Sequence, residues 1–166
     1  MIRAAGPHDA EAIAALQLRA WRVAYGPYVD ASNWDQPLAA RVERWRALLD
    51  GEQDGVTLVF DGNGKVAGFA SAGATRDEDG AAEGVGELYA LYVEPDLIGT
   101  GRGHDLLVAA EELLARDHAE ATLWVLEPNT QARRFYERHG WREDDRPYDR
   151  GRWHWAPSMR YRKGLR

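Results

Sequence analysis

The sequence predicts an α/β fold in which helices flank a mixed, mostly antiparallel central sheet, within one domain spanning residues 1–166. Three observations support this fold class. A length of 166 residues suits a single domain. Two apolar runs joined by the turn sequence DGNG form an antiparallel hairpin. Later apolar runs alternate with amphipathic helices, which is typical of strand–helix–strand crossovers in the same sheet.

The N-terminal third predicts one strand followed by two helices. Residues 2–4 form the strand, and Pro7 favours the first turn of a helix that continues to Ala24. Its apolar residues recur at helical spacing, at Ile13, Leu16, Ala20 and Val23. An aromatic-rich loop at 25–35 follows, and Asp35 or Asn33 caps a second helix over 36–49.

The middle of the chain predicts a hairpin and a further strand. The strands cover 56–60 and 65–74, because the Asn-Gly pair between them supplies the positive φ angles of a tight turn. Residues 75–84 form a polar loop or the end of a hairpin, and the strand at 86–93 ends before Pro95.

The C-terminal part alternates helices with strands. A glycine-rich turn opens a helix that reaches about residue 116 with one apolar face, and a buried strand follows at 121–125. Asn129 or Thr130 caps the next helix and Gly140 ends it. Strands at 141–144 and 153–161 close the fold.

Composition excludes several classes of function. The net charge of −6 argues against nucleic-acid binding, which needs a basic face. The absence of cysteine excludes disulfides, thiolate metal sites and a Cys nucleophile. No spaced set of His and carboxylate residues predicts a metal site. No apolar run approaches about 18 residues and no signal peptide is evident, so we expect a cytoplasmic protein that does not contact membranes.

The stretch "EPDLIGTGRGHDLL" (94–107) places three glycines in five positions at the start of a helix. A strand, a glycine-rich turn and a helix N-terminus direct several backbone N–H groups at one point, which is typical of a phosphate site. The turn lacks the Gly-Lys-Ser/Thr of a Walker loop, and His104 replaces the last glycine of a dinucleotide fingerprint. The alternative is a tight turn that binds nothing.

Two regions together resemble the GNAT superfamily of acetyl-CoA-dependent N-acetyltransferases. They are "ELYALYVEPDLIGTGRGHDLL" (87–107) and "LWVLEPNTQARRFYERHGW" (123–141). In the first, Gly101 and Gly103 match the glycines of the family's Gln/Arg-x-x-Gly-x-Gly/Ala loop, whereas Ile98 stands at its Gln/Arg position. In the second, matching residues are Asn129, Ala132, Tyr136, Gly140 and Trp141. The resemblance implies a GNAT-like acyl-CoA N-acyltransferase fold over the whole chain.

The resemblance also implies acetyl-CoA as cosubstrate and assigns residues to it. Its diphosphate is held by the loop residues Gly99, Thr100, Gly101, Arg102, Gly103 and His104. Its pantetheine arm runs between the strands 86–93 and 121–125, beside Leu91, Tyr92 and Val93. The helix after the second strand contributes Asn129, Ala132, Arg133 and Tyr136.

Two residues are predicted to be catalytic. Tyr136 occupies the place of the family's general acid for the departing thiolate; the alternative is a core tyrosine beside Phe135. Glu87, four residues before Leu91, corresponds to the base of histone-acetylating members; the alternative is a strand-end carboxylate paired with an arginine. A backbone N–H near Leu91 is expected to stabilise the developing oxyanion.

The acceptor is predicted to be a primary amine, either a small cationic molecule or a peptide or protein amine, attacking directly in a ternary complex. Aromatic and acidic side chains suit a cation. The predicted acceptor-site residues are Trp21, Tyr25, Tyr28, Trp34, Glu87 and Tyr89. The alternative function is a coenzyme-A-binding sensor or partner-binding module with little catalysis. A homodimer through an edge strand at 153–155 is also expected.

Overall fold

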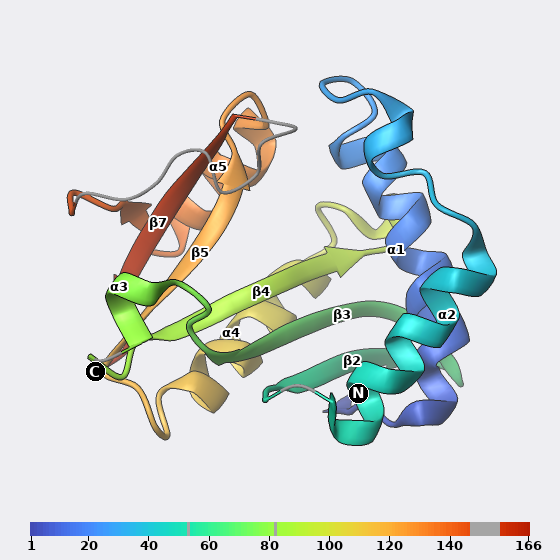
Figure 1. Ribbon diagram of the computed structural model, residues 1–166, viewed down its shortest axis with the longest axis horizontal. Helices are drawn as coiled ribbons and strands as arrows, with labels where there is room; N and C mark the ends of the chain where they lie inside the picture. The colour runs from blue at the N-terminus through green and yellow to red at the C-terminus, as the bar shows by residue number, and fades with distance from the viewer. Residues whose placement is uncertain (53, 82, 147–156) are drawn as a thin grey trace.

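One mixed sheet organises the computed structural model, which describes residues 1–52, 54–81, 83–146 and 157–166 (Figure 1). Within these residues the strand order is β1-β2-β3-β4-β5-β7-β6. Only the β4–β5 pair is parallel among the described strands. The strands are β1 (Ile2–Ala4), β2 (Val56–Gly62), β3 (Lys65–Ala74), β4 (Gly86–Val93), β5 (Glu120–Leu126), β6 (Arg142–Glu143) and β7 (Ser158–Gly164). The predicted fold class is therefore confirmed.

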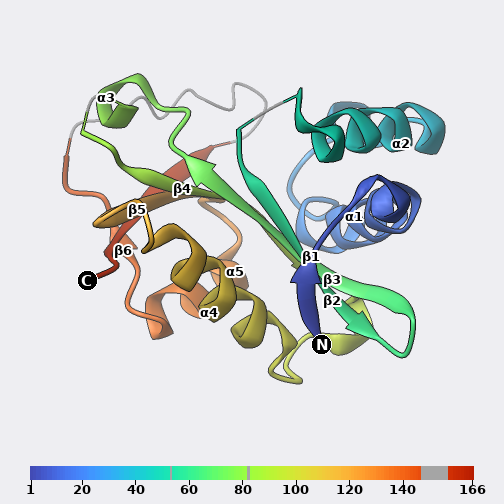
Figure 2. The same cartoon turned by 90° about the horizontal axis from the view of Figure 1, so that it is seen from below.

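Helices cover both faces of the sheet (Figure 2). The helices are α1 (Ala10–Ala24), α2 (Leu38–Ala47), α3 (Glu78–Ala81), α4 (Arg102–Leu114) and α5 (Thr130–Arg138). Single helical turns occur at Pro7–Asp9, Ala31–Asn33, Leu48–Glu52 and Pro95–Leu97. The helices α1 and α2 lie on one face, and α4 lies on the other (Figure 2).

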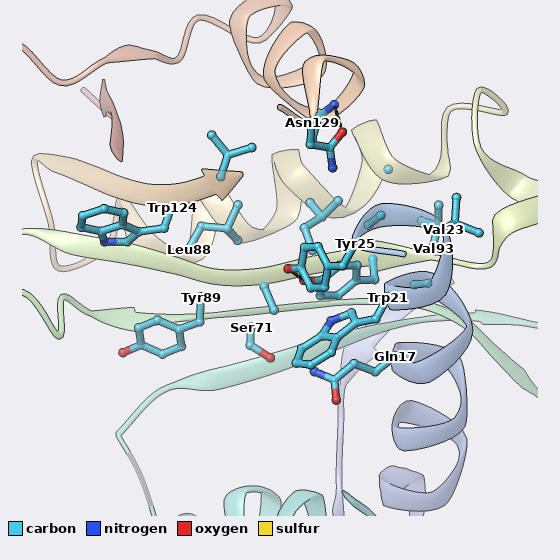
Figure 3. A pocket seen from close by; sticks show the side chains of 18 of the residues that line it. Gln17, Trp21, Val23, Tyr25, Ser71, Leu88, Tyr89, Val93, Trp124 and Asn129 are labelled. Carbon is cyan, nitrogen blue, oxygen red and sulfur yellow. Dashed lines mark hydrogen bonds between the residues drawn. The ribbon is translucent and has the colours of Figure 1, made fainter. Parts of the chain in front are cut away.

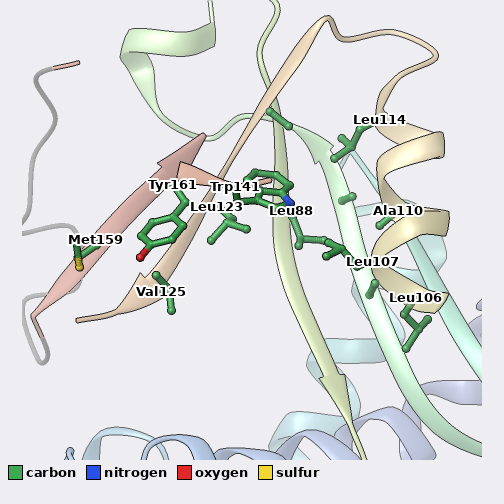
Figure 4. Packing of buried hydrophobic residues seen from close by; sticks show 13 residues of the cluster. Leu88, Leu106, Leu107, Ala110, Leu114, Leu123, Val125, Trp141, Met159 and Tyr161 are labelled. Atoms are coloured by element: carbon green, nitrogen blue, oxygen red, sulfur yellow. The ribbon is translucent and has the colours of Figure 1, made fainter. Parts of the chain in front are cut away.

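Side-chain alternation along the strands builds a separate core on each face. Val59 and Phe69 pack against α1 and α2, while Leu58 and Ala70, one residue along each strand, pack with α4. The larger core joins α4 to β4, β5 and β7, and its centre is the fully buried Trp141 (Figure 4). Trp141 Nε1 donates a hydrogen bond of 2.8 Å to Glu111 on α4, so its polar atom is satisfied inside the core.

Local signals account for several element boundaries. Asn63 and Gly64 adopt φ angles of 56° and 77° between β2 and β3, as the predicted hairpin turn requires. Asn129 caps α5, because its side chain accepts a hydrogen bond of 3.1 Å from the Ala132 N–H. Gly140 ends that helix with a φ of 86°.

Other predicted boundaries were wrong. The second helix begins at Leu38 rather than at 36, because the residue before Pro37 is disfavoured in helical conformation. Neither Asp35 nor Asn33 caps it; the acidic cap in this region is Asp30, which accepts from the Ser32 N–H at the 3₁₀ turn. The predicted loop at 75–84 contains α3.

The predicted final strand extends further than the sequence indicates. Its described part is β7, Ser158–Gly164, which pairs with β5 along its whole length. Residues 153–155, the predicted dimer edge, lie outside the described residues.

Arg160 on β7 links this strand to the connection between β3 and β4. The side chain of Arg160 is 2% exposed, and its nitrogens lie 2.7 Å from Asp79 and 2.7 Å from Asp144. It also lies 3.3 Å from Asp77. Because several carboxylates share the guanidinium, a charge that would be costly to bury is compensated within this network.

Candidate active site

The strands β4 and β5 diverge and form a fork in the sheet. They pair only from Gly86 to Leu88 on β4 and from Ala121 to Leu123 on β5. Beyond these residues β4 continues to Val93 alongside β3, and β5 continues to Leu126 alongside β7. The facing backbone edges of the fork are therefore free to bind an extended ligand.

A β-bulge in β4 accompanies the divergence. On β3, Ser71 and Ala72 are neighbours, but their partners on β4 are Ala90 and Leu88. Tyr89 is thus the extra residue, and bulges bend the strand that carries them. The bulge lies where β4 turns away from β5.

A pocket of about 890 Å³ opens at the fork, between the sheet, α1 and the N-terminus of α4 (Figure 3). Figure 3 shows Gln17 and Trp21 of α1 on one side, Ser71 and Tyr89 on the sheet, and Asn129 beyond β5. Most of the predicted cofactor residues line this pocket. They are Leu91, Tyr92, Val93, Gly99, Gly101, Gly103, His104, Asn129, Ala132 and Tyr136.

The glycine loop presents the start of α4 to the pocket. Gly101 is the N-cap of α4 with a φ of 90°, and Gly99 has a φ of 84°. A Cβ built on either residue would meet no atom within 4 Å, so backbone conformation rather than crowding favours glycine. The first turn of α4 leaves its N–H groups without partners inside the helix and carries a partial positive charge. This geometry suits an anion.

Three predicted cofactor residues lie outside the described pocket lining. The Thr100 hydroxyl donates a hydrogen bond of 2.7 Å to the Leu97 carbonyl. The Arg102 guanidinium lies 4.8 Å from the centre of the Phe60 ring and forms a 3.3 Å ion pair with Asp105. Arg133 donates bonds of 3.1 Å to the Tyr161 hydroxyl and the Glu127 carbonyl.

A pair of histidines stands at the α4 end of the pocket. His104 Nδ1 lies 2.9 Å from Nε2 of His139, and His139 Nδ1 lies 2.7 Å from the Phe135 carbonyl. Because a carbonyl only accepts, His139 carries its proton on Nδ1, and a neutral His139 accepts from His104. His139 was not predicted, since the two histidines are 35 residues apart in the sequence and no local pattern joins them.

Three tyrosines, Tyr25, Tyr92 and Tyr136, lie close together in the pocket. The hydroxyl groups of Tyr25 and Tyr92 lie 2.5 Å apart. Burial raises the pKa of Tyr25 to about 12, and burial also raises the pKa values of Tyr92 and Tyr136 above the usual value. All three therefore remain protonated near neutral pH. The Tyr136 hydroxyl makes no hydrogen bond to the described residues and lies on the pocket wall.

Glu87 is buried away from the pocket lining. It is 1% exposed, and it accepts bonds of 2.8 Å from the Arg76 N–H and 2.6 Å from the Arg76 guanidinium. The alternative considered for this residue, a strand-end carboxylate paired with an arginine, describes this arrangement. Arg76 in turn lies over the Tyr89 ring at 4.2 Å, and both of those side chains line the pocket.

The other predicted acceptor residues all line the pocket. They are Trp21, Tyr25, Tyr28, Trp34 and Tyr89. Trp34 is buried and donates from Nε1 to the Val29 carbonyl, which shapes the loop between α1 and α2. Trp124 was not predicted as a site residue; it lines the pocket and donates a bond of 3.0 Å to Asp77.

The described acidic residues near the C-terminus, Glu143, Asp144 and Asp145, do not line the pocket. Asp144 is buried, and it forms ion pairs of 2.7 Å with Arg160 and 3.0 Å with Arg162. Asp149 lies outside the described residues. Among the described lining residues, Asp54 is the only carboxylate.

The described residues also bear on metal binding and on membrane insertion. They contain no group of three or more His, Asp or Glu side chains arranged to hold a metal ion. None of the helices in this part of the chain has the length and apolar character needed to cross a bilayer.

Comparison with known proteins gives consistent matches. The sequence profile of the Acetyltransferase (GNAT) family matches residues 11–141. The uncharacterized N-acetyltransferase YuaI of Bacillus subtilis (strain 168) is 31% identical over 134 residues, which cover 77% of this chain and 72% of that protein.

Solved structures share the fold. The PaiA N-acetyltransferase of Thermoplasma acidophilum, in complex with coenzyme A, has a TM-score of 0.79 at 18% identity and covers 99% of this chain and 98% of its own. YncA of Salmonella typhimurium, with its cofactor acetyl-CoA, has a TM-score of 0.73 at 23% identity and covers 100% of this chain and 94% of its own.

Proposed function

The chain belongs to the GNAT family of acetyltransferases, and on this premise we propose that it transfers an acetyl group from acetyl-CoA to a primary amine by direct attack in a ternary complex. The fork between β4 and β5, with the N-terminus of α4 at its mouth, is the observation that carries the proposal. We also propose that this reaction takes place in the cytoplasm.

The residues at the fork fit the cosubstrate. The N–H groups from Gly101 to His104 would bind the diphosphate, because they lack helical partners and lie at the positive end of the α4 dipole. The free backbone edge of β4 from Leu91 to Val93 would pair with the amides of the pantetheine arm. The complexes of the PaiA protein with coenzyme A and of YncA with acetyl-CoA support this assignment.

The proposed chemistry uses groups that are already in place. Acetyl-CoA supplies a thioester carbonyl that the amine attacks. A backbone N–H of β4 that β3 does not engage would stabilise the developing oxyanion, which is worth roughly 3 kcal/mol in other enzymes. The Tyr136 hydroxyl has no hydrogen bond to the described residues, and its raised pKa keeps it protonated. It would therefore donate a hydrogen bond to the departing thiolate.

The proton on the amine needs a separate route. The assignment of Glu87 as base stays a prediction, since its carboxylate is engaged by Arg76 and does not line the described pocket. We propose that water in the pocket takes this proton, because the lining tyrosines hold their own protons at neutral pH. Under this proposal the rate rises with pH as the free-amine fraction of the acceptor grows.

Two measurements test the proposed function together. Acetyl-CoA at a hundredfold excess over its Kd should stabilise the fold by about 2.7 kcal/mol, seen as a rise in melting temperature. Release of free thiol from acetyl-CoA should then depend on an added amine, in a screen of amino acids, polyamines, aminoglycosides and peptide N-termini. A protein that shows neither response would contradict the proposal.

One feature favours a second function, a coenzyme-A-binding sensor with little catalysis. Ile98 stands where the family loop carries Gln or Arg, lines the pocket and is 45% exposed. An apolar residue there removes one side-chain contact to the cosubstrate. Thermal stabilisation by acetyl-CoA without thiol release for any amine would select the sensor over the enzyme.

A further inference from the structure

Arg41 on α2 is an unusual side chain for the wall of this pocket. It is 8% exposed, yet it forms no ion pair with a described residue. Its Nε is buried and has no hydrogen-bond partner among the described residues. A buried cation is costly unless an anion compensates it, so this guanidinium favours the binding of a negatively charged group.

The contacts of Arg41 hold it in one orientation. One terminal nitrogen donates a bond of 3.0 Å to Gln17 Oε1 and the other donates a bond of 2.5 Å to the Trp34 carbonyl. The guanidinium also lies 4.5 Å from the centre of the Trp21 ring. All of these partners are neutral, so they fix the guanidinium without cancelling its charge.

Neighbouring charges also favour an anion beside Arg41. Burial lowers the pKa of Arg41, and the nearby positive charge of Arg44 lowers it further. Asp35 acts in the opposite direction, but it forms its ion pair with Arg22, at 3.8 Å. Arg44 lines the same pocket, is exposed and forms no ion pair with described residues.

Arg41 also lies close enough to the proposed reaction centre for one small acceptor to reach both. Its guanidinium packs on Trp21, and the Trp21 ring centre lies 6.5 Å from that of Tyr92 on β4. Tyr92 immediately follows Leu91, beside which the thioester would lie. An acceptor bound against Trp21 would thus have one end at Arg41 and the other at the fork.

We propose that the acceptor is an amino acid, or a similar small molecule that carries a carboxylate near its primary amine, and that Arg41 binds the carboxylate. This inference rests on the proposed function. It refines the predicted cationic acceptor, since the reacting amine is cationic before it loses its proton while the group that anchors the molecule is anionic. Each terminal nitrogen of Arg41 keeps one N–H that Gln17 and Trp34 do not engage, and these N–H groups would donate to the carboxylate oxygens.

The decisive experiment compares matched acceptors with the wild-type protein. Glycine, β-alanine, γ-aminobutyrate and δ-aminovalerate are each assayed beside the corresponding amide, which keeps the shape and removes the charge. The kcat/KM values are divided by the fraction of free amine at the assay pH. At least one acid should exceed its amide by about 10- to 100-fold, the range expected for a hydrogen bond to a charged group.

Variants then assign the preference to a residue. Arg41→Gln should abolish the preference for the acid over the amide, and Arg41→Lys should retain part of it. Arg46→Gln is the control, because Arg46 lies on the same helix, is exposed and pairs with Glu43. If Arg41→Gln does not fold, the wild-type comparison and Arg41→Lys still decide the matter.

The outcomes separate the two proposals. Turnover of acids and amides at equal rates would overturn the role of Arg41 as a carboxylate anchor and leave the acetyltransferase proposal intact. If no amine is turned over, binding of the same acids and amides is measured by thermal shift in the presence of acetyl-CoA. Stabilisation by an acid alone would support the anchor, and stabilisation by neither would overturn it.

Discussion

Replacement of Tyr136 by Phe distinguishes a catalytic role of the hydroxyl group from a packing role of the ring. The ring contacts Phe135 and Trp141, with centre-to-centre distances of 5.3 and 6.3 Å, and the substitution preserves both contacts. The hydroxyl makes no hydrogen bond to the described residues, so its removal leaves no described partner unsatisfied. We therefore expect the melting temperature of Tyr136→Phe to stay within about 1 °C of wild type.

The expected effect on catalysis is much larger. A hydroxyl that donates to the departing thiolate contributes about 1.4–4 kcal/mol to the transition state, so kcat should fall by about 10- to 1,000-fold. The affinity for acetyl-CoA should change little, because this interaction strengthens only as the thiolate forms. Single-turnover measurements on the ternary complex report the chemical step directly.

Tyr161→Phe is the matched control. The Tyr161 hydroxyl donates a bond of 2.7 Å to Glu137 and accepts a bond of 3.1 Å from Arg133, and the residue is 1% exposed. Its loss should cost about 1–3 kcal/mol of stability, or about 2–10 °C in melting temperature for a chain of this size. Turnover per folded molecule should be unchanged. An unchanged single-turnover rate for Tyr136→Phe would remove Tyr136 from the mechanism.

Three further predictions concern the cosubstrate loop, Glu87 and acid stability. Gly101→Val should abolish the thermal shift produced by acetyl-CoA, whereas Gly64→Val, with a similarly open positive φ of 77° in the β2–β3 turn and outside the described pocket lining, should keep that shift in melting scans. Glu87→Gln should lower stability, because a neutral amide would replace the charge-assisted hydrogen bonds that the buried Glu87 carboxylate accepts from Arg76 with weaker ones. Its kcat/KM should keep the pH profile of wild type; loss of the ascending limb would restore Glu87 as base. The hydrogen bond from Arg3 holds the pKa of Asp9 below its usual value, so this carboxylate stabilises the fold above about pH 4 and loses that effect as pH falls through the lowered pKa. Denaturant titrations from pH 2 to 6 should therefore show a shallower acid dependence for Asp9→Asn, and an equally steep dependence would contradict this assignment.

The sequence predicted the fold well, because its signals are local. The Asn-Gly turn, the Asn129 cap and the glycines before α4 each act within a few residues, and each specifies an element end. The second helix begins at Leu38 instead of at 36, because Pro37 restricts the residue before it to extended conformations, a signal that apolar periodicity does not contain.

The site was only partly predictable for a related reason. The lining residues on β4 and the glycine loop follow from their positions in consecutive motifs. By contrast, the contact of Glu87 with Arg76 depends on how the β3–β4 connection folds back, and nothing in the strand sequence reports it. The Gln17–Arg41–Trp34 contacts join three separate segments of the chain. No local sequence pattern therefore predicts that Arg41 is buried.

The narrow junction between β4 and β5 has a consequence for how the molecule opens. Three residue pairs connect β4 with β5, whereas β5 and β7 share seven pairs. The segment formed by β5, α5 and β7 is therefore a candidate unit for sub-global unfolding, at a lower free energy than the segment formed by β1 to β4. A pantetheine arm lying in the fork would act as an additional strand and bridge the two segments. Amide hydrogen exchange in β5 should then slow more than exchange in β2 when acetyl-CoA binds, so the cosubstrate would join two cooperative units into one.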